Sequence, residues 1–342
     1  MSAPPPRPLP DRPRLKSHVA VVPMGANAVL LKGPGLFVRY SGEAVDVVLA
    51  LLPLLDGTAT SEEVVARSRR DPADARDVLA ALVAENVVED AAQDAAHLLP
   101  AAERARIAPQ LRYLSHASTA PAEAMNRLVR ANVLLLGDGA LADEAARTLD
   151  AARVGKVQRA SLPMRADADE RRALLQGHDH VLLATDTSMP PLFLDVNAAC
   201  LELGARWTGA FLDQHEAIVG PTVLPGETAC WRCYDLRAKG AHPRMDRLLA
   251  YEGGRWSEGA IRPERSGLPS FAAIAGAWAG QAVVQTLAQV TLPPLAGKVL
   301  RVEPLELHAE THRVLRLPRC PACGGGGVPD VDRYALDRVD LG

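Results

Sequence analysis

The sequence predicts an α/β protein with two domains, a small winged-helix-like α+β domain followed by a larger Rossmann-like α/β domain with a four-cysteine site. Three observations predict this fold class. Short β-prone runs precede helical patterns in residues 18–92, a buried strand with a glycine turn begins at residue 131, and two CxxC pairs follow. A chain of 342 residues can form more than one core, because single cores stop growing at about 250 residues.

Composition and charge exclude several classes of protein. A formal net charge of −3 and a pI near 6.3 give no electrostatic footprint for nucleic acid or an anionic membrane. No segment reaches the roughly 18 uninterrupted apolar residues of a membrane span. Five cysteines in a chain of this length fit metal binding in a reducing compartment better than a disulfide framework. We therefore expect a cytoplasmic protein.

The first domain is predicted from alternating and helical hydrophobic patterns. The expected strands and then helices are residues 19–22, 28–31, 36–40, 44–55, 61–68 and 73–85. Such a unit is too small for a deep catalytic cleft but suits the docking of a peptide. The complete division is a disordered arm (1–17), the winged-helix-like domain (18–92), a helical connector (93–130), the α/β domain (131–329) and a tail (330–342).

The second domain begins with a buried strand, residues 131–136, and a glycine turn that contains Gly137 and Gly139. This strand, turn and helix resembles the opening of a dinucleotide-type βαβ unit, which predicts a parallel sheet. A second buried strand, 181–184, precedes Asp186. A long helix and two closing strands are expected at 271–290, 299–302 and 313–317.

The two CxxC pairs are the strongest local signal in the sequence. Each CxxC turn places two thiolates on one side of a loop, and two turns supply the ligands of a tetrahedral zinc with bonds of about 2.3 Å. The metal ligands expected are Cys230, Cys233, Cys320 and Cys323. Four thiolates leave no open position for substrate, so the zinc would be structural; unmetallated or redox-active pairs are the alternative. Cys200 lies in an apolar helical run and is expected to be a buried spacer.

The glycine turn by itself fits a nucleotide site and a structural turn equally well. A nucleotide site should have an acidic residue at the end of the second strand, about 20 residues after the glycines, and residues 156–163 contain none. Asp138 adds negative charge where a phosphate would lie. ATP is therefore not expected as a cofactor. Asp186 is predicted either to contact Mg²⁺ or nucleotide, together with Gly137 and Gly139, or to be the N-cap or turn carboxylate before the helix that begins at Pro190-Pro191.

With these residues in view, residues 131–329 resemble the ThiF-like, ubiquitin-activating-like superfamily, and more narrowly its ocin-ThiF-like branch in azoline-forming peptide maturation. The matching segments are 133–139, 184–186, 218–221, 225–233 and 315–324. Residues 18–90 resemble the PqqD-like winged helix, the leader-recognition element found in front of such domains. That resemblance is carried by residues 54–58, 61–63, 78–82 and 87–88.

The resemblance implies a role in the maturation of ribosomally made peptides such as thiazole- and oxazole-modified microcins, bacteriocins or thiopeptides. The chain would bind the leader of the precursor and deliver its core to a YcaO-type cyclodehydratase, which would use the ATP and form the thiazolines or oxazolines. ThiF-like domains usually dimerise, so the resemblance also implies a homodimer. The chain itself would be a non-catalytic subunit.

The expected docking mode is addition of the leader as a strand, with backbone hydrogen bonds giving affinity and side-chain pockets giving specificity. Replacing Val38 by proline should then remove a ladder donor. The predicted peptide-binding residues are Leu36, Phe37, Val38, Arg39, Tyr40, Val78, Leu79 and Leu82.

Two other functions fit parts of the sequence. The chain could be an adenylating ThiF-like enzyme that activates a peptide carboxylate, with Asp186 on magnesium and the glycine turn near phosphate. It departs from the adenylating members by lacking their acidic strand end and their Arg/Lys set, for which Arg153, Lys156 and Arg165 would have to substitute. A zinc-dependent structural adaptor without peptide specificity is the third reading.

Overall fold

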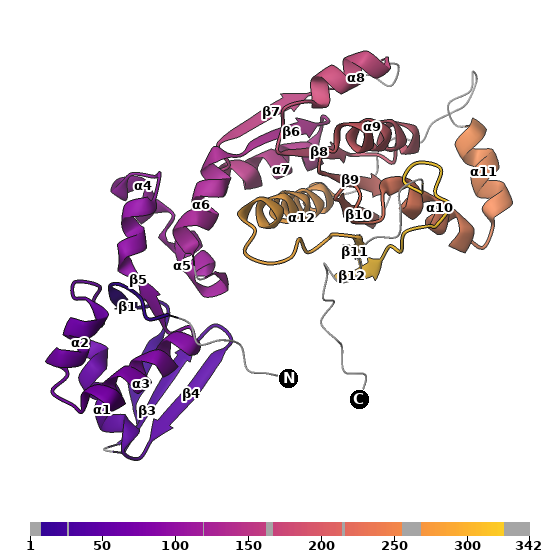
Figure 1. The fold of residues 1–342 in the computed structure, drawn as a ribbon. Helices are drawn as coiled ribbons and strands as arrows, with labels where there is room; N and C mark the ends of the chain where they lie inside the picture. The colour runs from indigo at the N-terminus through magenta and orange to yellow at the C-terminus, as the bar shows by residue number, and fades with distance from the viewer. Residues whose placement is uncertain are drawn as a thin grey trace. The chain divides into compact units, whose positions relative to one another are not determined.

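The computed structural model describes residues 8–25, 27–118, 120–161, 167–213, 216–254 and 268–324. The chain forms two compact units, Met1–Val129 and Arg130–Gly342, whose elements are labelled in Figure 1. The protein is a mixed α/β protein, as the sequence predicts. The predicted tail, residues 330–342, lies outside the described residues, as does Arg165.

The first unit contains the three predicted strands as one antiparallel sheet. The strands are β2 (Ala20–Pro23), β3 (Ala28–Gly33) and β4 (Leu36–Ser41), in the order β2-β3-β4. β3 is central and places Val29 and Leu31 in the core with no exposed area. β4 alternates between half-buried and exposed side chains, which is typical of a strand with one face on a core.

Three helices cover this sheet and begin at the residues that the sequence favours. They are α1 (Ala44–Leu51), which continues as a 3₁₀ turn (Leu52–Leu54), α2 (Ser61–Arg67) and α3 (Pro72–Ala84). Thr60 and Glu63 form a capping box at the start of α2, and the Asp71 carboxylate accepts from two N–H groups at the start of α3. Leu51, Leu79 and Leu82 fill the core between the helices and β3.

The arm is ordered from Pro8 onward, so the prediction of disorder through residue 17 is wrong for its described part. Residues Pro13–Leu15 form β1, which pairs antiparallel with β5 (Val88–Asp90). The Asp90 carboxylate accepts from the N–H groups of Asp11 and Arg12, and Arg14 forms ion pairs with Glu89 and Asp94. Proline and arginine suggested a solvated segment, but Arg14 has carboxylate partners and the Arg12 guanidinium donates to the Thr58 carbonyl.

Helices follow in the connector, as expected. They are a 3₁₀ segment (Ala91–Ala96), α4 (Ala101–Arg106), α5 (Ala108–Ala117) and α6 (Pro121–Arg130). The Lys16 side chain, which is 2% exposed, joins α5 to the preceding domain. Its ammonium donates to Asn86 Oδ1 at 2.6 Å and to the Ser115 carbonyl at 2.5 Å.

The second unit is built on a seven-stranded sheet in the order β12-β11-β10-β9-β8-β6-β7. Its strands are β6 (Asn132–Leu136), β7 (Lys156–Ala160), β8 (His180–Thr185), β9 (Trp207–Asp213), β10 (Glu216–Val223), β11 (Lys298–Glu303) and β12 (His308–Arg313). The strands β9-β8-β6-β7 are parallel, whereas β10, β11 and β12 are antiparallel additions. The prediction of a parallel sheet therefore holds for four of the seven strands and is wrong for the other three. The last strand, β12, also ends at Arg313, the residue at which the sequence predicted the second closing strand to begin.

Helices cover both faces of this sheet (Figure 1). The first face carries α8 (Ala168–Leu175), α9 (Pro190–Leu203) and α10 (Trp231–Ala241), which share one hydrophobic core with it. On the second face α7 (Ala140–Ala151) packs against α12 (Pro269–Ala288). The remaining helix, α11 (Met245–Gly254), follows α10 along the chain.

Within the described residues, α12 alone is long and apolar enough to cross a membrane. Two thirds of its apolar window is buried inside the protein, as in a core helix. Gly276 and Gly280 allow this helix to approach α7 closely. A Cβ at Gly276 would lie 2.5 Å from the Leu141 carbonyl oxygen, and one at Gly280 would lie 2.7 Å from Thr148 Cβ.

The substitution Gly276→Ala tests this close helix contact. The added methyl group meets backbone that cannot move independently, so we expect a loss of about 1–3 kcal/mol in the free energy of unfolding. Gly240→Ala in α10 is the matched control, because a Cβ there meets nothing within 4 Å and should stabilise the helix by up to about 1 kcal/mol. Chemical denaturation of both variants measures the difference. Equal stabilisation by the two substitutions would contradict the packing.

Candidate functional site

The four predicted cysteines come together in the second unit. The Sγ–Sγ distances are 3.9 Å between Cys230 and Cys233, 3.7 Å between Cys230 and Cys320, and 3.5 Å between Cys233 and Cys323. All four sulfur atoms lie within 4.8 Å of one another. A tetrahedron with Zn–S bonds of about 2.3 Å has edges of about 3.8 Å. The cluster therefore has the size and the ligand type of a Cys₄ zinc site.

Rigid packing positions the first cysteine pair at the start of α10. The Trp231 indole lies against Phe193 with ring centroids 4.5 Å apart, and its backbone N–H donates to Asn197 Oδ1 at 2.9 Å. Gly209 of β9 gives these rings their space, because a Cβ there would lie 2.8 Å from Trp231. Trp231 thus packs against the core beside the loop that carries Cys230 and Cys233.

The second cysteine pair is held through the segment before it. The Arg316 guanidinium donates to the carbonyl groups of Gly226 and Cys323, so it joins the two cysteine loops directly. The Arg237 side chain donates to the Leu315 carbonyl at 2.7 Å. These bonds bring together residues that are far apart in the sequence.

Burial favours the neutral thiol at three of the five cysteines. It raises the pKa of Cys230 and of Cys233, so a metal ion has to displace their protons on binding. Burial alone raises the pKa of Cys200 to about 12, and this side chain has no exposed area. Cys200 is therefore a neutral core residue, which confirms its interpretation as a spacer.

The glycine turn and Asp186 also come together, but the carboxylate itself fills the anion position. The Asp186 oxygens accept hydrogen bonds from the N–H groups of Ala140 and Leu141, both at 2.9 Å, at the first turn of α7. Gly137 and Gly139 have φ values of +128° and +108°, and a Cβ on Gly139 would overlap this carboxylate. Asp186 thus caps α7, whereas the cap expected from the sequence was at the helix that begins at Pro190, whose N-cap position is Met189 and has no side-chain cap.

Of the three basic residues considered for phosphate binding, Lys156 and Arg153 are described, and both lie away from this turn. Register pairs Lys156 with Asn132 at the beginning of β6, whereas the glycine turn follows its end. Four residues of strand separate the two positions, or about 13 Å. Arg153 precedes Lys156 and lies at the same end of the strand. At the end of β7 the Ser161 hydroxyl donates to the Asp138 carboxylate at 2.7 Å.

In the first unit, β4 is an edge strand with an open ladder. The two-residue turn Pro34-Gly35 places Gly33 directly opposite Leu36. These two residues form a hydrogen-bonded pair, in which each N–H donates to the carbonyl of the other, because the alternative alternation would need the N–H group that Pro34 lacks. The N–H groups of Leu36, Val38 and Tyr40 therefore point toward β3. Those of Phe37 and Arg39 point outward. The hydrogen bond from the Met24 N–H to the Ala28 carbonyl, on the β2 side of β3, requires the same alternation of inward and outward N–H groups.

The predicted peptide-binding residues divide into two groups. Leu36, Tyr40 and Val78 are partly buried and border the core, while Phe37 is 71% exposed. Leu79 and Leu82 have no exposed area. Their prediction as peptide contacts is therefore corrected: helical periodicity places them on the inner face of α3, where they pack against the sheet.

A cavity of about 180 Å³ lies at one end of β4 and was missed by sequence reasoning. Its walls are the Gly33-Pro34-Gly35 turn and Leu36 on one side and the end of α3 on the other, including Glu85 and Asn86. His18 and His116 complete the walls. These residues are spread over about a third of the chain, so no spacing in the sequence could have identified them.

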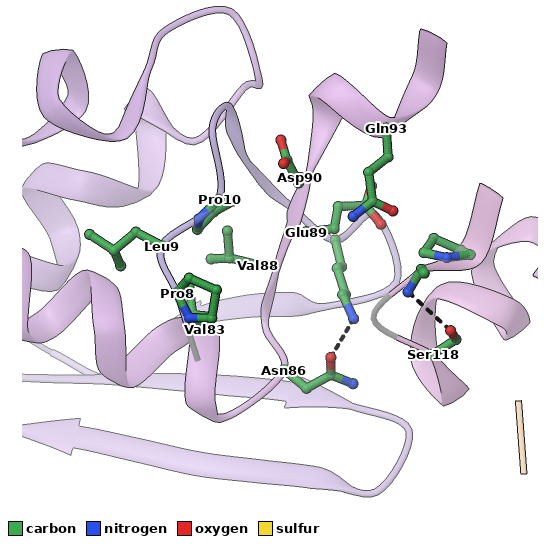
Figure 2. A pocket seen from close by; sticks show the side chains of 13 residues that line it. Pro8, Leu9, Pro10, Val83, Asn86, Val88, Glu89, Asp90, Gln93 and Ser118 are labelled. Atoms are coloured by element: carbon green, nitrogen blue, oxygen red, sulfur yellow. Dashed lines mark hydrogen bonds between the residues drawn. The ribbon is translucent and has the colours of Figure 1, made fainter. Parts of the chain in front are cut away.

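A larger cavity, of about 440 Å³, lies on the other side of Asn86 and is shown in Figure 2. Asn86 accepts from Lys16 there, as the dashed line shows, and donates to the His116 carbonyl at 2.9 Å. Glu89 accepts from Arg14 and from the Ser115 hydroxyl. These polar groups hold the arm and α5 in place.

Comparisons with known proteins support the fold. No family model and no curated protein matches the sequence. The heterocyclase TruD is 21% identical with a TM-score of 0.69, and the match covers 92% of this chain and 43% of TruD. A heterocyclase in complex with substrate and cofactor matches at 20% identity and a TM-score of 0.66, over 92% and 40% of the two chains. E. coli MccB with ATP matches at 14% identity and 0.69, over 91% and 99%.

The chain thus has the fold of these proteins and spans about two fifths of the two heterocyclase chains. The second unit makes up less than two thirds of the chain, whereas the matches to TruD and MccB cover more than nine tenths of it. The matched part therefore includes most of the first unit as well.

Removing metal from the purified protein tests the cysteine cluster. A structural zinc should hold the two loops together, so a chelator should lower the melting temperature by on the order of 10 °C. Metal analysis should find about one zinc per chain in the wild type and less in Cys323→Ser. Cys200→Ala is the control and should keep its zinc. A chelated protein with an unchanged melting temperature would rule out the structural role.

Proposed function

We propose that this chain binds the leader of a ribosomally synthesised precursor peptide and delivers the core to a YcaO-type cyclodehydratase for thiazoline or oxazoline formation. The first unit would bind the leader, and the second would be a zinc-stabilised scaffold. Support comes from the sequence resemblance and from the fold shared with two heterocyclases. The cytoplasm, where thiols stay reduced, is the expected location, because all five cysteines are free.

The open edge of β4 is the observation that carries this proposal. Its outward N–H and C=O groups at Phe37 and Arg39 can pair with an added strand, which is how many domains bind extended peptides. The opposite edge of the same sheet is less suitable. β2 ends at Pro23, which offers no N–H at an outward position. The β4 edge is therefore the better template.

Side chains beside this edge supply specificity. Leu36, Val38 and Tyr40 are partly buried and line the helix side of β4, and Val78 borders the same core from α3. An extended leader places alternate side chains toward these groups. The pKa of Tyr40 is raised by burial and by Glu85, so this tyrosine stays neutral and its hydroxyl can donate a hydrogen bond.

The second unit supports a scaffold rather than a nucleotide enzyme. A phosphate at the start of α7 would have to displace the Asp186 carboxylate from its two N–H donors, and both groups are anionic. A partner cyclodehydratase would then supply the ATP-dependent step. A homodimer remains part of the proposal on the strength of the resemblance.

The alternative is an adenylating enzyme, and the match to almost the whole length of ATP-bound MccB favours it. ATP–pyrophosphate exchange separates the two functions. The chain alone, with its precursor peptide and Mg²⁺, should show no exchange above the background without protein. Exchange that depends on peptide would replace the scaffold proposal with the enzyme.

The substitution Arg39→Pro tests leader addition at β4. It removes an outward donor without removing a bond to β3, so the fold should persist while affinity for the leader falls at least about tenfold. Fluorescence polarisation with a labelled leader peptide measures this affinity.

Two further variants make the test specific. Arg39→Ala keeps the N–H and should bind as the wild type does. Val38→Pro removes a donor to β3, so it should destabilise the sheet itself and is the wrong variant for this question. Full affinity in folded Arg39→Pro would place the leader elsewhere.

A further inference from the structure

A third cavity, of about 370 Å³, lies in the first unit between the arm, β5, α4 and α5. It adjoins the smaller cavity at the end of β4, because neighbouring residues line the two. Ser17 lines this cavity and His18 the smaller one, and Ser115 and His116 of α5 are divided in the same way. A peptide that leaves β4 at this end therefore comes close to the third cavity.

Two accessible guanidinium groups, those of Arg104 and Arg112, line this cavity. Arg104 Nη1 donates to the Asp94 carbonyl at 3.1 Å, and Arg112 Nε donates to the Ser17 hydroxyl at 3.2 Å. Neither group forms an ion pair with a residue that the structure describes. Arg112 is exposed and Arg104 is half-buried. A guanidinium has five N–H donors, so both groups keep donors that a ligand in the cavity can reach.

The two carboxylates in the lining already have partners. Glu89 accepts from Arg14 Nε at 2.9 Å and from the Ser115 hydroxyl at 2.7 Å, and Asp94 accepts from both terminal nitrogens of Arg14. The hydrogen bonds from Arg14 hold the pKa of Asp94 below its usual value, so this carboxylate is ionised near pH 7. Both carboxylates are thus committed to Arg14 and are not available to the other two guanidinium groups.

The charges of the lining select a singly charged anion. Three guanidinium groups face two carboxylates, so the lining has one positive charge in excess. His97 adds none, because burial, followed by the charge of Arg104, lowers the pKa of its imidazole, which is neutral near pH 7. A cation would be repelled, and a phosphate group with a charge of about −2 would more than reverse the excess. A carboxylate balances it, and its two oxygens match the paired donors of a guanidinium.

The direction of an added strand brings a peptide to this cavity. The sheet β2-β3-β4 is antiparallel throughout, so a leader added to β4 would run opposite to that strand and leave the sheet where β4 begins. A Cβ at Gly35, in the turn before β4, would lie 3.7 Å from His116 Cε1, so this turn lies against α5. Arg112 is one helical turn from His116, or about 6 Å along the axis, which is about the length of two extended residues.

We propose that this third cavity is a specificity pocket for one acidic side chain, Asp or Glu, placed about two to four residues after the strand-forming segment of the leader. Arg112 binds the carboxylate from α5, and Arg104 binds it from α4. The proposal rests on leader binding at β4 and adds the chemical class of one recognised residue.

Selection from a displayed library of random linear peptides tests this pocket without knowledge of the natural leader. The bait is the full, zinc-loaded chain, as wild type and as Arg112→Gln, Arg112→Lys and the double variant Arg104→Gln/Arg112→Gln. Arg106→Gln is the matched control, because Arg106 also lies on α4 but pairs with Glu103 and does not line the cavity. Arg39→Pro reports on the β4 edge. Melting temperatures identify the variants that fold as the wild type does.

The expected result is specific in position and in charge. Wild type, Arg106→Gln and Arg112→Lys should enrich peptides with an alternating apolar segment followed by Asp or Glu at a fixed distance. Arg112→Gln should keep the segment and weaken the acidic preference, and the double variant should lose it. In a selected peptide, replacing the acidic residue by its amide should raise Kd about fivefold for wild type, less at high salt, and leave it unchanged for the double variant.

Other outcomes overturn one proposal or the other. Uncharged, basic or apolar residues at that position, or an acidic preference that survives in the folded double variant, would refute the acidic pocket and leave leader binding intact. Displacement of a selected peptide by millimolar inorganic phosphate would also refute it, because the cavity would then prefer a phosphate group. If wild type enriches no peptide, or if folded Arg39→Pro enriches the same peptides equally well, the leader-binding function itself fails.

Discussion

The Asp186 carboxylate at the start of α7 determines what the second unit can do. It lies at the carboxyl edge of the parallel strands, where open α/β sheets bind their ligands, and it accepts from both Ala140 and Leu141. A carboxylate at a helix N-terminus stabilises the helix by about 1 kcal/mol. Gly137 and Gly139 are needed for this interaction. A Cβ at Gly137 would collide with the Ala184 carbonyl of β8, and one at Gly139 would collide with the Asp186 carboxylate that follows β8. A glycine-rich turn can therefore serve a protein's own carboxylate.

In the proposed function, the first unit would bind an extended chain through backbone groups at the edge of β4, which do not read its sequence. Specificity would then come from the side chains beside this edge and at its Leu36 end. The buried Lys16 ammonium holds that end in place, because it bonds to Asn86 after α3 and to Ser115 in α5. The cavity wall that contains His116 is thereby fixed to the strand.

Local patterns predicted the local elements, and long-range geometry was beyond them. The strands around Leu31 and the helix around Leu79 have clear periodicity, and the cysteine spacing predicted a metal site whose four sulfur atoms do come together. β12 was misplaced because all six of its residues are exposed, while the apolar residues after it resemble a strand. Lys16 carried no signal, since a lysine in a Pro/Arg-rich arm looks solvated. The contact of Asp186 with the start of α7 joins residues that are 46 positions apart, so it carried no local signal.

Cys230 and Cys320 are separated by 90 positions in the chain, and this separation has a thermodynamic consequence. A cross-link that closes a loop of this length removes about 4–5 kcal/mol of chain entropy from the unfolded state at room temperature. Zinc bound in the folded protein would act as such a cross-link wherever it also stays bound during unfolding. β10 ends shortly before Cys230, and β11 lies inside the loop. With the loop closed, the refolding chain would search a smaller space for the pairing of these two strands. Metal supply would in this way set the rate of folding as well as the stability.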